Sequence, residues 1–465
     1  MNDQPSATTD ASARGGIRPR MDVMPIVERV RSLILESEEE LENRRIPEKL
    51  VDELYDAGVM RALMPEELGG LEMHPLDWLD LTYELSRLNG SVGWLAVICS
   101  GCTILFDMET MTELQAGTRL LNAGSAGRMG NALKVDGGYR VSGRWNFASG
   151  SPFADYLSAT AFLVDQSDEP ILDDAGRPQV LEVLFKADEV TRFENWDGLG
   201  LRGTGSNDFE AKDLFVDERM VHELGAWAEP FASRPLYRHF LAQQGHASHA
   251  LGVARGAIDS YIELANRPAQ RQSSRQLKVG KAQMDKVAVA KADALVRAAR
   301  LFAWDTTNWI YEDAFDEARI DEAYLLLQEA NIFAVRAGKE AVNLIFDRAG
   351  VDGVIRGRRL ERQFRDMTTA AQHVANVEDA YESIGHFHIT GEPPHGPRHR
   401  AEDGKPRERR RDCAQDRRDQ PVRLSRSARP VPPVRILARC RIRAGGRRRR
   451  GASGSSCAAC PIGSG

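Results

Sequence analysis

Two short segments combine residue types that could bind a ligand or move a proton. In "SGRWNFASGSPFADY", Ser149 follows an alternating run that predicts a strand, so a hydroxyl and nearby backbone N–H groups stand at a strand end. That arrangement suits contact with a planar heterocycle, although a serine that only satisfies a turn would look the same. In "FRDMTTAAQHVAN", the imidazole of His373 titrates near neutral pH and could act as an acid or base. A packed or surface histidine is the alternative.

A third segment, "WDGLGLRGTGSNDF" at 196–209, gathers four glycines around two hydroxyl side chains, at Gly198, Gly200, Gly203, Gly205, Thr204 and Ser206. Glycines let a backbone approach a ligand closely, but a glycine-rich turn would have a similar sequence. No G-x-G-x-x-G follows a strand and opens a helix, and there is no P-loop. The sequence therefore excludes a Rossmann dinucleotide site and a P-loop nucleotide site.

Length and composition predict a multidomain protein outside membranes. The chain has 465 residues, of which 42% are hydrophobic, which predicts two or three domains. No apolar run reaches about 18 residues, so we expect no membrane span, and residues 1–21 lack a signal-peptide core and predict a disordered leader. We expect a cytoplasmic protein.

Charge and cysteine content differ sharply between the main part of the chain and its end. Residues 391–465 contain 20 Lys and Arg against 7 Asp and Glu, so the remainder is strongly acidic and a poor match for nucleic acid. Residues 1–390 contain two cysteines, Cys99 and Cys102, which excludes a disulfide scaffold.

Hydrophobic periodicity divides the chain into three structured parts. Residues 22–120 have apolar residues at helical spacing and predict a helical domain. Residues 121–225 contain short alternating runs, with a Gly-Gly turn in "ALKVDGGYRVSGRWNFASG" that predicts a hairpin. Residues 226–397 return to helical spacing, including one very long helix around "AQMDKVAVAKADALVRAARLFAWDTTNWIY".

The segment 398–465 has no apolar periodicity and is dominated by Arg, Pro, Ser, Gly and Cys. One interpretation is a basic tail that binds nucleic acid, and another is a metal or redox role for Cys457 and Cys460. A lone Cys-x-x-Cys is weak support for the second interpretation. We favour a third, in which the Arg-rich run is the product of a shifted reading frame in a GC-rich gene, so we expect no specific nucleic-acid binding.

The order and spacing of these motifs resemble the acyl-CoA dehydrogenase superfamily across about residues 25–395. The resemblance rests on helices, then "RWNFASG" and "GLRGTGSND" in a β region, then a helical bundle containing "RLERQFRD". It implies an α+β fold with an N-terminal helical domain, a middle β-barrel or sandwich domain and a C-terminal four-helix bundle. The motifs are most similar to the branch of two-component flavin-dependent monooxygenases.

A missing carboxylate separates this branch from the dehydrogenases. Dehydrogenases of the superfamily need a general base, usually a glutamate shortly after the Arg-Asp pair, but Arg365-Asp366 is followed by "MTTAAQHVAN", which has no acid. The earlier helix that carries the base in other members reads "FLAQQGHASHALG" and also lacks one. His373 occupies this neighbourhood instead.

The resemblance implies a monooxygenase that takes reduced flavin, FMNH2 or FADH2, from a separate NAD(P)H-flavin reductase. Dioxygen would add at flavin C4a, and the distal oxygen would pass to a phenolic or other small aromatic substrate. Ser149 matches the position that hydrogen-bonds flavin N5. His373 would lie close to flavin and substrate, where it could deprotonate a phenol or hydrogen-bond the activated oxygen.

Further site residues are expected by the same resemblance. The expected flavin contacts are Phe147, Thr204, Ser206, Arg202, Arg267 and Arg271, although Arg202 could instead face a neighbouring carboxylate and the other two arginines could be solvated. Trp94 and Phe106 are expected to line the substrate pocket, with core packing as the alternative. His246 and His249 lack a carboxylate partner at ligand spacing, so we expect no metal.

Two other functions stay open at the level of sequence. One is an acyl-CoA dehydrogenase that oxidises a thioester with FAD, and the other is a non-catalytic remnant of the fold. Members of the superfamily are usually tetramers formed through the helical bundle, so a homotetramer is expected.

Overall fold

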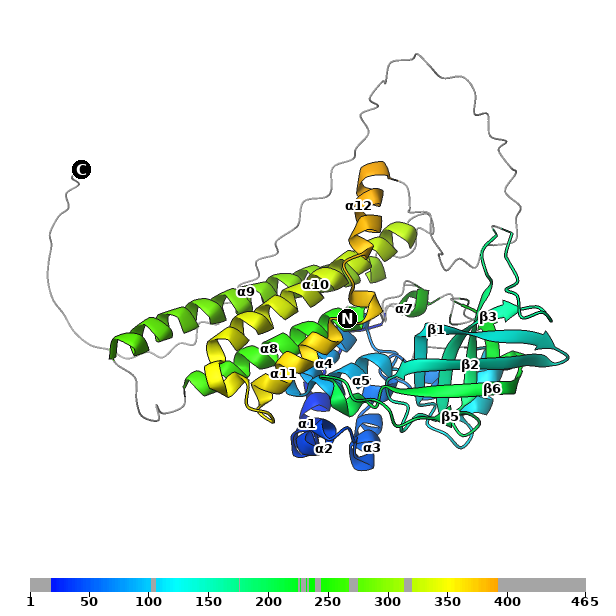
Figure 1. Cartoon of the computed structure of the whole chain (residues 1–465), viewed down its shortest axis with the longest axis horizontal. Helices are drawn as coiled ribbons and strands as arrows, with labels where there is room; N and C mark the ends of the chain where they lie inside the picture. Colours follow the sequence, from blue (N-terminus) through cyan, green and yellow to red (C-terminus); the bar gives the residue numbers. More distant parts are fainter. Residues whose placement is uncertain are drawn as a thin grey trace, which may run out of the picture. The chain divides into compact units, whose positions relative to one another are not determined.

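The computed structural model of the chain describes residues 18–391, apart from 102–105, 175, 225, 227–230, 232–233, 239–243, 267–274 and 313–319. Along this part of the chain, a group of helices precedes a β-sheet, and a second group of helices follows it (Figure 1). This order confirms the predicted α+β fold. The leader before residue 18 and the Arg-rich tail lie outside the described residues.

One of the N-terminal helices is apolar on all sides. The described helices are α1 Met24–Glu36, α2 Glu38–Glu42, α3 Glu48–Asp56, α4 Pro75–Leu88, α5 Gly90–Ile98 and α6 Met108–Gln115. In α5 every residue from Gly90 to Val97 is buried, so this helix is inside the fold. The Asn89 side chain caps it by accepting hydrogen bonds from the backbone N–H groups of Ser91 and Val92.

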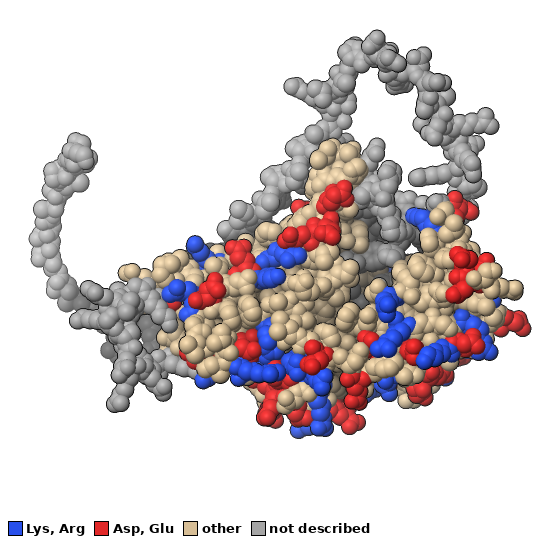
Figure 2. Space-filling model, in the orientation of Figure 1, with Lys and Arg blue, Asp and Glu red and all other residues tan. Residues whose placement is uncertain are grey.

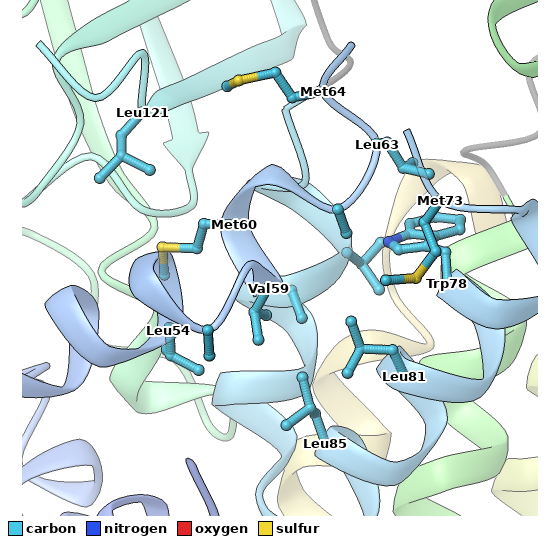
Figure 3. Close-up of a cluster of buried hydrophobic side chains, with 14 of the residues drawn as sticks. Leu54, Val59, Met60, Leu63, Met64, Met73, Trp78, Leu81, Leu85 and Leu121 are labelled. Atoms are coloured by element: carbon cyan, nitrogen blue, oxygen red, sulfur yellow. The ribbon is translucent and has the colours of Figure 1, made fainter. Parts of the chain in front are cut away.

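Aliphatic and sulfur-containing side chains from α3, α4 and the segment between them form the core of this region (Figure 3). Leu54, Met60, Trp78 and Leu85 are each no more than 1% exposed. Burial of a side chain of this kind contributes about 1.5–3 kcal/mol to stability. Val92 and Ala96 of α5 belong to the same core, which therefore fixes the position of that helix.

The middle part is one seven-stranded sheet of order β5-β6-β2-β1-β3-β4-β7. Its strands are β1 Asn122–Val135, β2 Gly138–Ala148, β3 Tyr156–Val164, β4 Val180–Lys186, β5 Thr191–Arg192, β6 Asn207–Asp217 and β7 Val221–Glu223. The pairing of β1 with β3 is parallel and the other pairings are antiparallel. The predicted hairpin is confirmed, because Val135 pairs with Gly138 across a turn in which Gly137 has a φ of 72°.

Three aromatic rings fill the interior of the sheet. Trp145, Phe185 and Phe209 are at most 1% exposed, and Trp145 stacks on Phe209 with ring centroids 5.2 Å apart. The indole N–H of Trp145 donates to the Thr160 carbonyl at 2.9 Å, so this buried polar atom is satisfied. The packing fixes β2, which leads directly to Ser149.

The C-terminal part contains the long helices. Its described helices are α7 Pro235–Arg238, α8 Gly245–Ala265, α9 Arg275–Glu312, α10 Ile320–Ala349, α11 Arg359–Ala370 and α12 Ala380–Thr390. The 38-residue α9 confirms the predicted very long helix. In Figure 1, α8 and α11 lie between the long pair α9 and α10 and the N-terminal helices.

Small residues bring α8 very close to α4. A Cβ atom added at Gly252 would lie 2.3 Å from the Tyr83 carbonyl oxygen, and one at Gly256 would lie 2.6 Å from the Arg87 carbonyl oxygen. Larger side chains at these positions would therefore push the helices apart. Because α5 follows α4 directly, this close approach also sets the separation between α5 and the start of α8.

The described surface carries mixed charge. On the face shown in Figure 2, basic and acidic side chains are interspersed. Several exposed pairs of opposite charge form ion pairs, such as Arg219 with Glu113 at 2.8 Å. Within the described residues, no helix is long and apolar enough to cross a membrane. No cluster of three or more potential metal ligands is found in the same residues.

Candidate active site

The turn after β2 is hydrogen-bonded to the glycine-rich segment at 196–209, called here the glycine-rich loop. Phe147 and Gly150 have positive φ angles of 64° and 89°, which reverse the chain around Ser149. The backbone N–H of Gly150 then donates to the Thr204 carbonyl at 2.8 Å. Positive φ costs energy for an aromatic residue, and strain of this kind concentrates at functional sites.

A chain of hydroxyl groups runs from Ser149 into this loop, and its direction can be deduced. The Thr204 hydroxyl donates to the Leu201 carbonyl at 2.8 Å, because a carbonyl can only accept. The 2.6 Å contact between Thr204 and Ser206 must therefore use the Ser206 proton, and the 2.7 Å contact between Ser206 and Ser149 must use the Ser149 proton. The Trp94 indole N–H donates to Ser149 Oγ at 3.1 Å. The Ser149 hydroxyl is left with one free lone pair and no free proton.

The ring of Trp94 contacts three imidazoles. Its centroid lies 5.1 Å from His246, 5.1 Å from His249 and 5.4 Å from His373. The rings of His246 and His373 stack on each other with centroids 4.4 Å apart and planes at 28°. Trp94 therefore connects the hydroxyl chain of the β side to a group of imidazoles on the helical side.

Hydrogen bonds assign the tautomers of two of these histidines. His249 Nε2 lies 2.9 Å from the Gly90 carbonyl oxygen, so this nitrogen carries the proton. His373 Nδ1 accepts from the backbone N–H of Ala375 at 3.2 Å, so the proton of the neutral His373 ring is on Nε2. His246 makes no hydrogen bond to any described residue, and its Nδ1 is buried without a partner.

All three imidazoles are held in the neutral form. Burial lowers the pKa of His373 and of His249 to about 4. Burial, together with repulsion from the other two histidines when they are charged, lowers the pKa of His246 well below its ordinary value. At neutral pH the group is uncharged, so its members act as hydrogen-bond donors and acceptors.

Residues from α10 and the turn after α11 hold His373 in place. The Asn376 side chain donates to the Ala370 carbonyl at 2.9 Å and accepts from Asn331 at 3.0 Å. Arg336 donates to the Asn376 carbonyl at 3.2 Å. The turn that carries His373 is therefore tied both to the end of α11 and to α10.

The Arg-Asp pair of α11 holds the glycine-rich loop. Asp366 accepts from the Leu201 backbone N–H at 2.6 Å, and Arg365 donates to the Leu199 carbonyl at 2.8 Å. A Cβ atom at Gly200 would lie 2.3 Å from the Arg365 backbone, so only glycine fits there. Burial raises the pKa of Asp366 to about 6, although the Leu201 N–H and nearby arginines favour its charged form. One helix thus positions both the hydroxyl chain and His373.

The structure brings together five of the residues singled out from the sequence, Ser149, Thr204, Ser206, Trp94 and His373. Trp94 is 5% exposed and links the two halves of the group, so its part in substrate binding stays a prediction. Phe147 is 63% exposed and meets the ring of Trp196 edge-on at 6.2 Å. Its expected contact with a cofactor also stays a prediction.

The remaining predicted residues are placed elsewhere. Arg202 pairs with Asp197 at 2.7 Å and donates to the Glu42 carbonyl at 2.8 Å, which corresponds to the neighbouring-carboxylate alternative. Phe106 is buried against the ring of His222 at 5.3 Å, and no described contact joins it to Trp94. Arg267 and Arg271 lie outside the described residues.

Sequence reasoning missed the parts played by His246 and Asp366. His246 and His249 were considered only as metal ligands, yet a spacing of three residues on a helix also places two rings on one face. That spacing was the available signal for a paired contact with an aromatic side chain. Asp366 served only as a landmark, since nothing in the sequence shows that its carboxylate reaches Leu201.

Comparisons with known proteins identify relatives of both helical parts. Residues 26–113 match the family model described as acyl-CoA dehydrogenase, N-terminal domain, and residues 244–378 match the one described as acyl-CoA dehydrogenase, C-terminal domain. Indole-3-acetate monooxygenase of Pseudomonas putida is 28% identical over 367 residues, which cover 75% of this chain and 89% of that protein.

A second relative and a solved structure agree with this assignment. The oxygenase subunit HsaA of a flavin-dependent monooxygenase from Mycobacterium tuberculosis is 28% identical over 375 residues, covering 76% of this chain and 90% of that protein. The crystal structure of 3-HSA hydroxylase from Rhodococcus sp. RHA1 superposes with a TM-score of 0.70 at 24% identity, over 80% of this chain and 98% of that one. The latter likeness concerns the fold.

Proposed function

The chain belongs to the acyl-CoA dehydrogenase superfamily, and we propose that within it the protein is the oxygenase component of a two-component flavin-dependent monooxygenase that hydroxylates an aromatic compound. The observation that carries the proposal is the group around Trp94. It places a hydroxyl with a free lone pair on one side and neutral imidazoles on the other. Among the described residues, no carboxylate joins these rings to serve as the base of a dehydrogenase.

The residues beside Ser149 fit a reduced flavin, FMNH2 or FADH2. Reduced flavin carries a proton on N5, and Ser149 Oγ has a lone pair that no described group uses. Phe147 on the turn and Leu199 on the glycine-rich loop are 63% and 58% exposed, which leaves apolar surface for a planar ring. We propose Ser149, Phe147, Thr204 and Ser206 as the cofactor side of the site.

Bound reduced flavin supplies oxygen in an activated form for transfer to the substrate. Ser149 would accept the N5–H hydrogen bond and keep that proton in place, which delays the loss of oxygen as hydrogen peroxide. The Ser149 hydroxyl proton does not point toward N5, because it is donated to Ser206, whose own proton is donated to Thr204. Ser206 and Thr204 therefore act by orienting the Ser149 hydroxyl.

His373 would contribute a hydrogen-bond donor. Its Nδ1 is occupied by the Ala375 N–H, and its other nitrogen carries the proton of the neutral ring. Of the two roles expected from the sequence, this arrangement supports donation of a hydrogen bond to oxygen and not removal of a substrate proton. Burial, which lowers the pKa of His373 to about 4, also keeps the ring neutral during the reaction.

Oxygenase components of two-component systems receive reduced flavin from a separate reductase, so such a reductase is the partner. We propose that the protein is a homotetramer assembled through its helical bundle. The support is exposed apolar side chains on the bundle, with Leu301 73%, Phe333 41% and Ile389 87% exposed. The cytoplasmic location stays a prediction.

The function is tested by mixing the full-length protein with reduced flavin and oxygenated buffer. We expect the protein to delay flavin oxidation and hydrogen peroxide release relative to free flavin, and to form hydroxylated product from some member of a panel of phenols and indoles. Flavin absorbance, a peroxidase-coupled assay and chromatography measure the three quantities. Reduction of bound FAD by an acyl-CoA, without any delay in peroxide release, would show a dehydrogenase. Failure to bind flavin at all would indicate a non-catalytic remnant.

A further inference from the structure

His246 is a buried histidine whose hydrogen-bonding capacity is unused. It lies at the start of α8 and is 7% exposed. Its ring stacks on His373 with centroids 4.4 Å apart and contacts Trp94 at a tilt, with centroids 5.1 Å apart. Its Nδ1 is buried and has no partner. A buried polar atom without a partner destabilises the folded state, so one that persists in a site calls for a functional explanation.

The other two histidines of the group are less suited than His246 to accept a proton from a substrate. Neutral His249 carries its proton on Nε2, which is bound to the Gly90 carbonyl. Its Nδ1 also lacks a partner, but it belongs to a residue that is 0% exposed, whereas His246 is 7% exposed. Neutral His373 uses its only lone pair on the Ala375 N–H. Neutral His246 has one nitrogen with a lone pair in either tautomer, and neither nitrogen is bound to a described residue. The stacked pair thus places one N–H donor beside one acceptor.

We infer that His246 is the catalytic base that accepts the hydroxyl proton of a phenolic substrate, beside the donor His373. The inference rests on the proposed function and specifies its substrate class as aromatic compounds with a hydroxyl conjugated to the reacting carbon. Hydrogen-bond donation then belongs to His373 and proton acceptance to His246, whereas the sequence led us to expect either role of His373.

The proton movement balances with the oxygen transfer. The reacting ring carbon forms a bond to one oxygen atom, while the phenolic O–H bond breaks and its electron pair forms a C=O bond to the ring. The proton passes to His246. The attacked carbon then loses its hydrogen as a proton to the newly bound oxygen, and His246 returns its proton to the C=O oxygen, which restores the aromatic ring with two hydroxyl groups. The second oxygen atom leaves as water, with the two electrons and two hydrogens of the reduced flavin.

A weak base is suited to this step. The titratable groups that face His246 are His373 and His249, and with burial they lower its pKa well below the ordinary value. A simple phenol has a pKa of about 10, so His246 would not ionise it in the ground state. The hydroxyl becomes much more acidic only as the ring gives electrons to oxygen. Proton transfer then accompanies the new C–O bond, and the interaction strengthens in the transition state.

The test compares phenols that are ionised at the assay pH with phenols that are not. His246→Gln removes the base but keeps an amide, and His246→Phe keeps the stacked ring, so at least one folded variant is expected. A nitrophenol, assayed above its pKa so that it is ionised, needs no base, whereas a simple phenol at the same pH does. The measured quantity is the ratio of product-formation rates between wild type and variant for the same substrate, which cancels the ring's own reactivity.

We expect this ratio to be about 100 or more for the simple phenol, as for loss of a general base, and close to one for the ionised nitrophenol. For the nitrophenol, the ratio should rise again as pH falls below the pKa of the substrate. Equal ratios for both phenols would overturn the inference, because a merely structural role would slow both alike.

The outcomes also separate this inference from the proposed function. Both variants are first tested for delayed peroxide release from reduced flavin, which reports folding and cofactor binding without any substrate. If wild type shows no delay and hydroxylates nothing, the proposed function fails. If wild type hydroxylates only aromatics without a hydroxyl, or hydroxylates phenols as fast as both variants do, the assignment of His246 alone fails.

Discussion

The two sides of Trp94 differ in how completely their hydrogen bonds are satisfied. On the β side, each hydroxyl from Ser149 to Thr204 donates once, and the chain ends at a backbone carbonyl. On the helical side, neither His246 nor the Nε2 atom of His373 has a hydrogen bond to a described residue. A satisfied network favours one fixed geometry, whereas unused donors and acceptors are available to a substrate. The β side is therefore suited to holding a cofactor and the helical side to reacting with a substrate.

Removing the donor of the helical side should have the largest effect. His373→Ala is expected to lower product formation by about 100-fold or more, because oxygen transfer loses a positioned hydrogen-bond donor. Flavin oxidation and peroxide release should continue, since the Ser149 side is unchanged. Product yield per flavin oxidised measures the effect.

The matched control is His388→Ala, which removes a histidine that is 54% exposed on α12. It should leave yield unchanged. Retained hydroxylation in His373→Ala would mean that the division of labour between the two sides is wrong.

The pH dependence of stability tests the contact through which Asp366 of α11 holds the glycine-rich loop. Burial raises the pKa of Asp366 to about 6, from an ordinary value of 3.8. A carboxyl with a raised pKa binds its proton more tightly when folded, so its stabilising effect is present below about pH 4 and lost as pH rises through 6. Relative to Asp366→Asn, which keeps an acceptor for the Leu201 N–H, the free energy of unfolding of wild type should fall by about 2 kcal/mol between pH 4 and pH 7.

Urea unfolding of both proteins across this range provides the measurement. If the free energies of unfolding of wild type and Asp366→Asn change in parallel with pH, Asp366 titrates as an ordinary carboxyl. Its contact with the glycine-rich loop would then not depend on its charge.

A smaller effect, on the rate of peroxide release, is expected when the Ser149 hydroxyl on the β side is removed. Ser149→Ala removes the acceptor proposed for N5–H, and loss of one hydrogen bond of about 1 kcal/mol corresponds to roughly fivefold faster peroxide release. Coupling of flavin oxidation to product should fall accordingly. Stopped-flow absorbance with a peroxidase assay gives both quantities, and unchanged coupling would remove Ser149 from this role.

Thr204→Val is expected to have the smallest effect on peroxide release, because it removes only the last hydroxyl of the chain. Ser206 and Ser149 would keep their oxygens but lose the constraint on proton direction, so peroxide release should accelerate by about twofold, less than in Ser149→Ala. Thr204→Ser retains the hydroxyl and should behave as wild type. Identical behaviour of the valine and serine variants would contradict an orienting role.

Local patterns in the sequence were sufficient for the order of elements and part of the site. Apolar periodicity predicted the helical parts and α9, and turn chemistry predicted the hairpin at Gly137. These features depend on neighbours along the chain. Ser149 and His373 were selected by family resemblance and by the absence of a carboxylate near Asp366.

The remaining features depend on contacts between distant segments. The tautomer of His373 follows from its hydrogen bond to Ala375, and the free state of His246 follows from the packing of α8 against α5 and the turn after α11. For Arg202, a phosphate and a carboxylate both require a cation, so the residue type could not choose between them. The pairing with Asp197 becomes visible only in three dimensions.

The double attachment of α11 has a consequence for how this sequence can change in length. The helix contacts the glycine-rich loop through Asp366 and carries His373 seven residues later, so the peptide between them sets the spacing of the two sides. Each residue of a helix turns the chain by about 100°, so one inserted or deleted residue here would rotate the imidazole away from Trp94. Natural variants should therefore differ in the composition of this segment and agree in its number of residues.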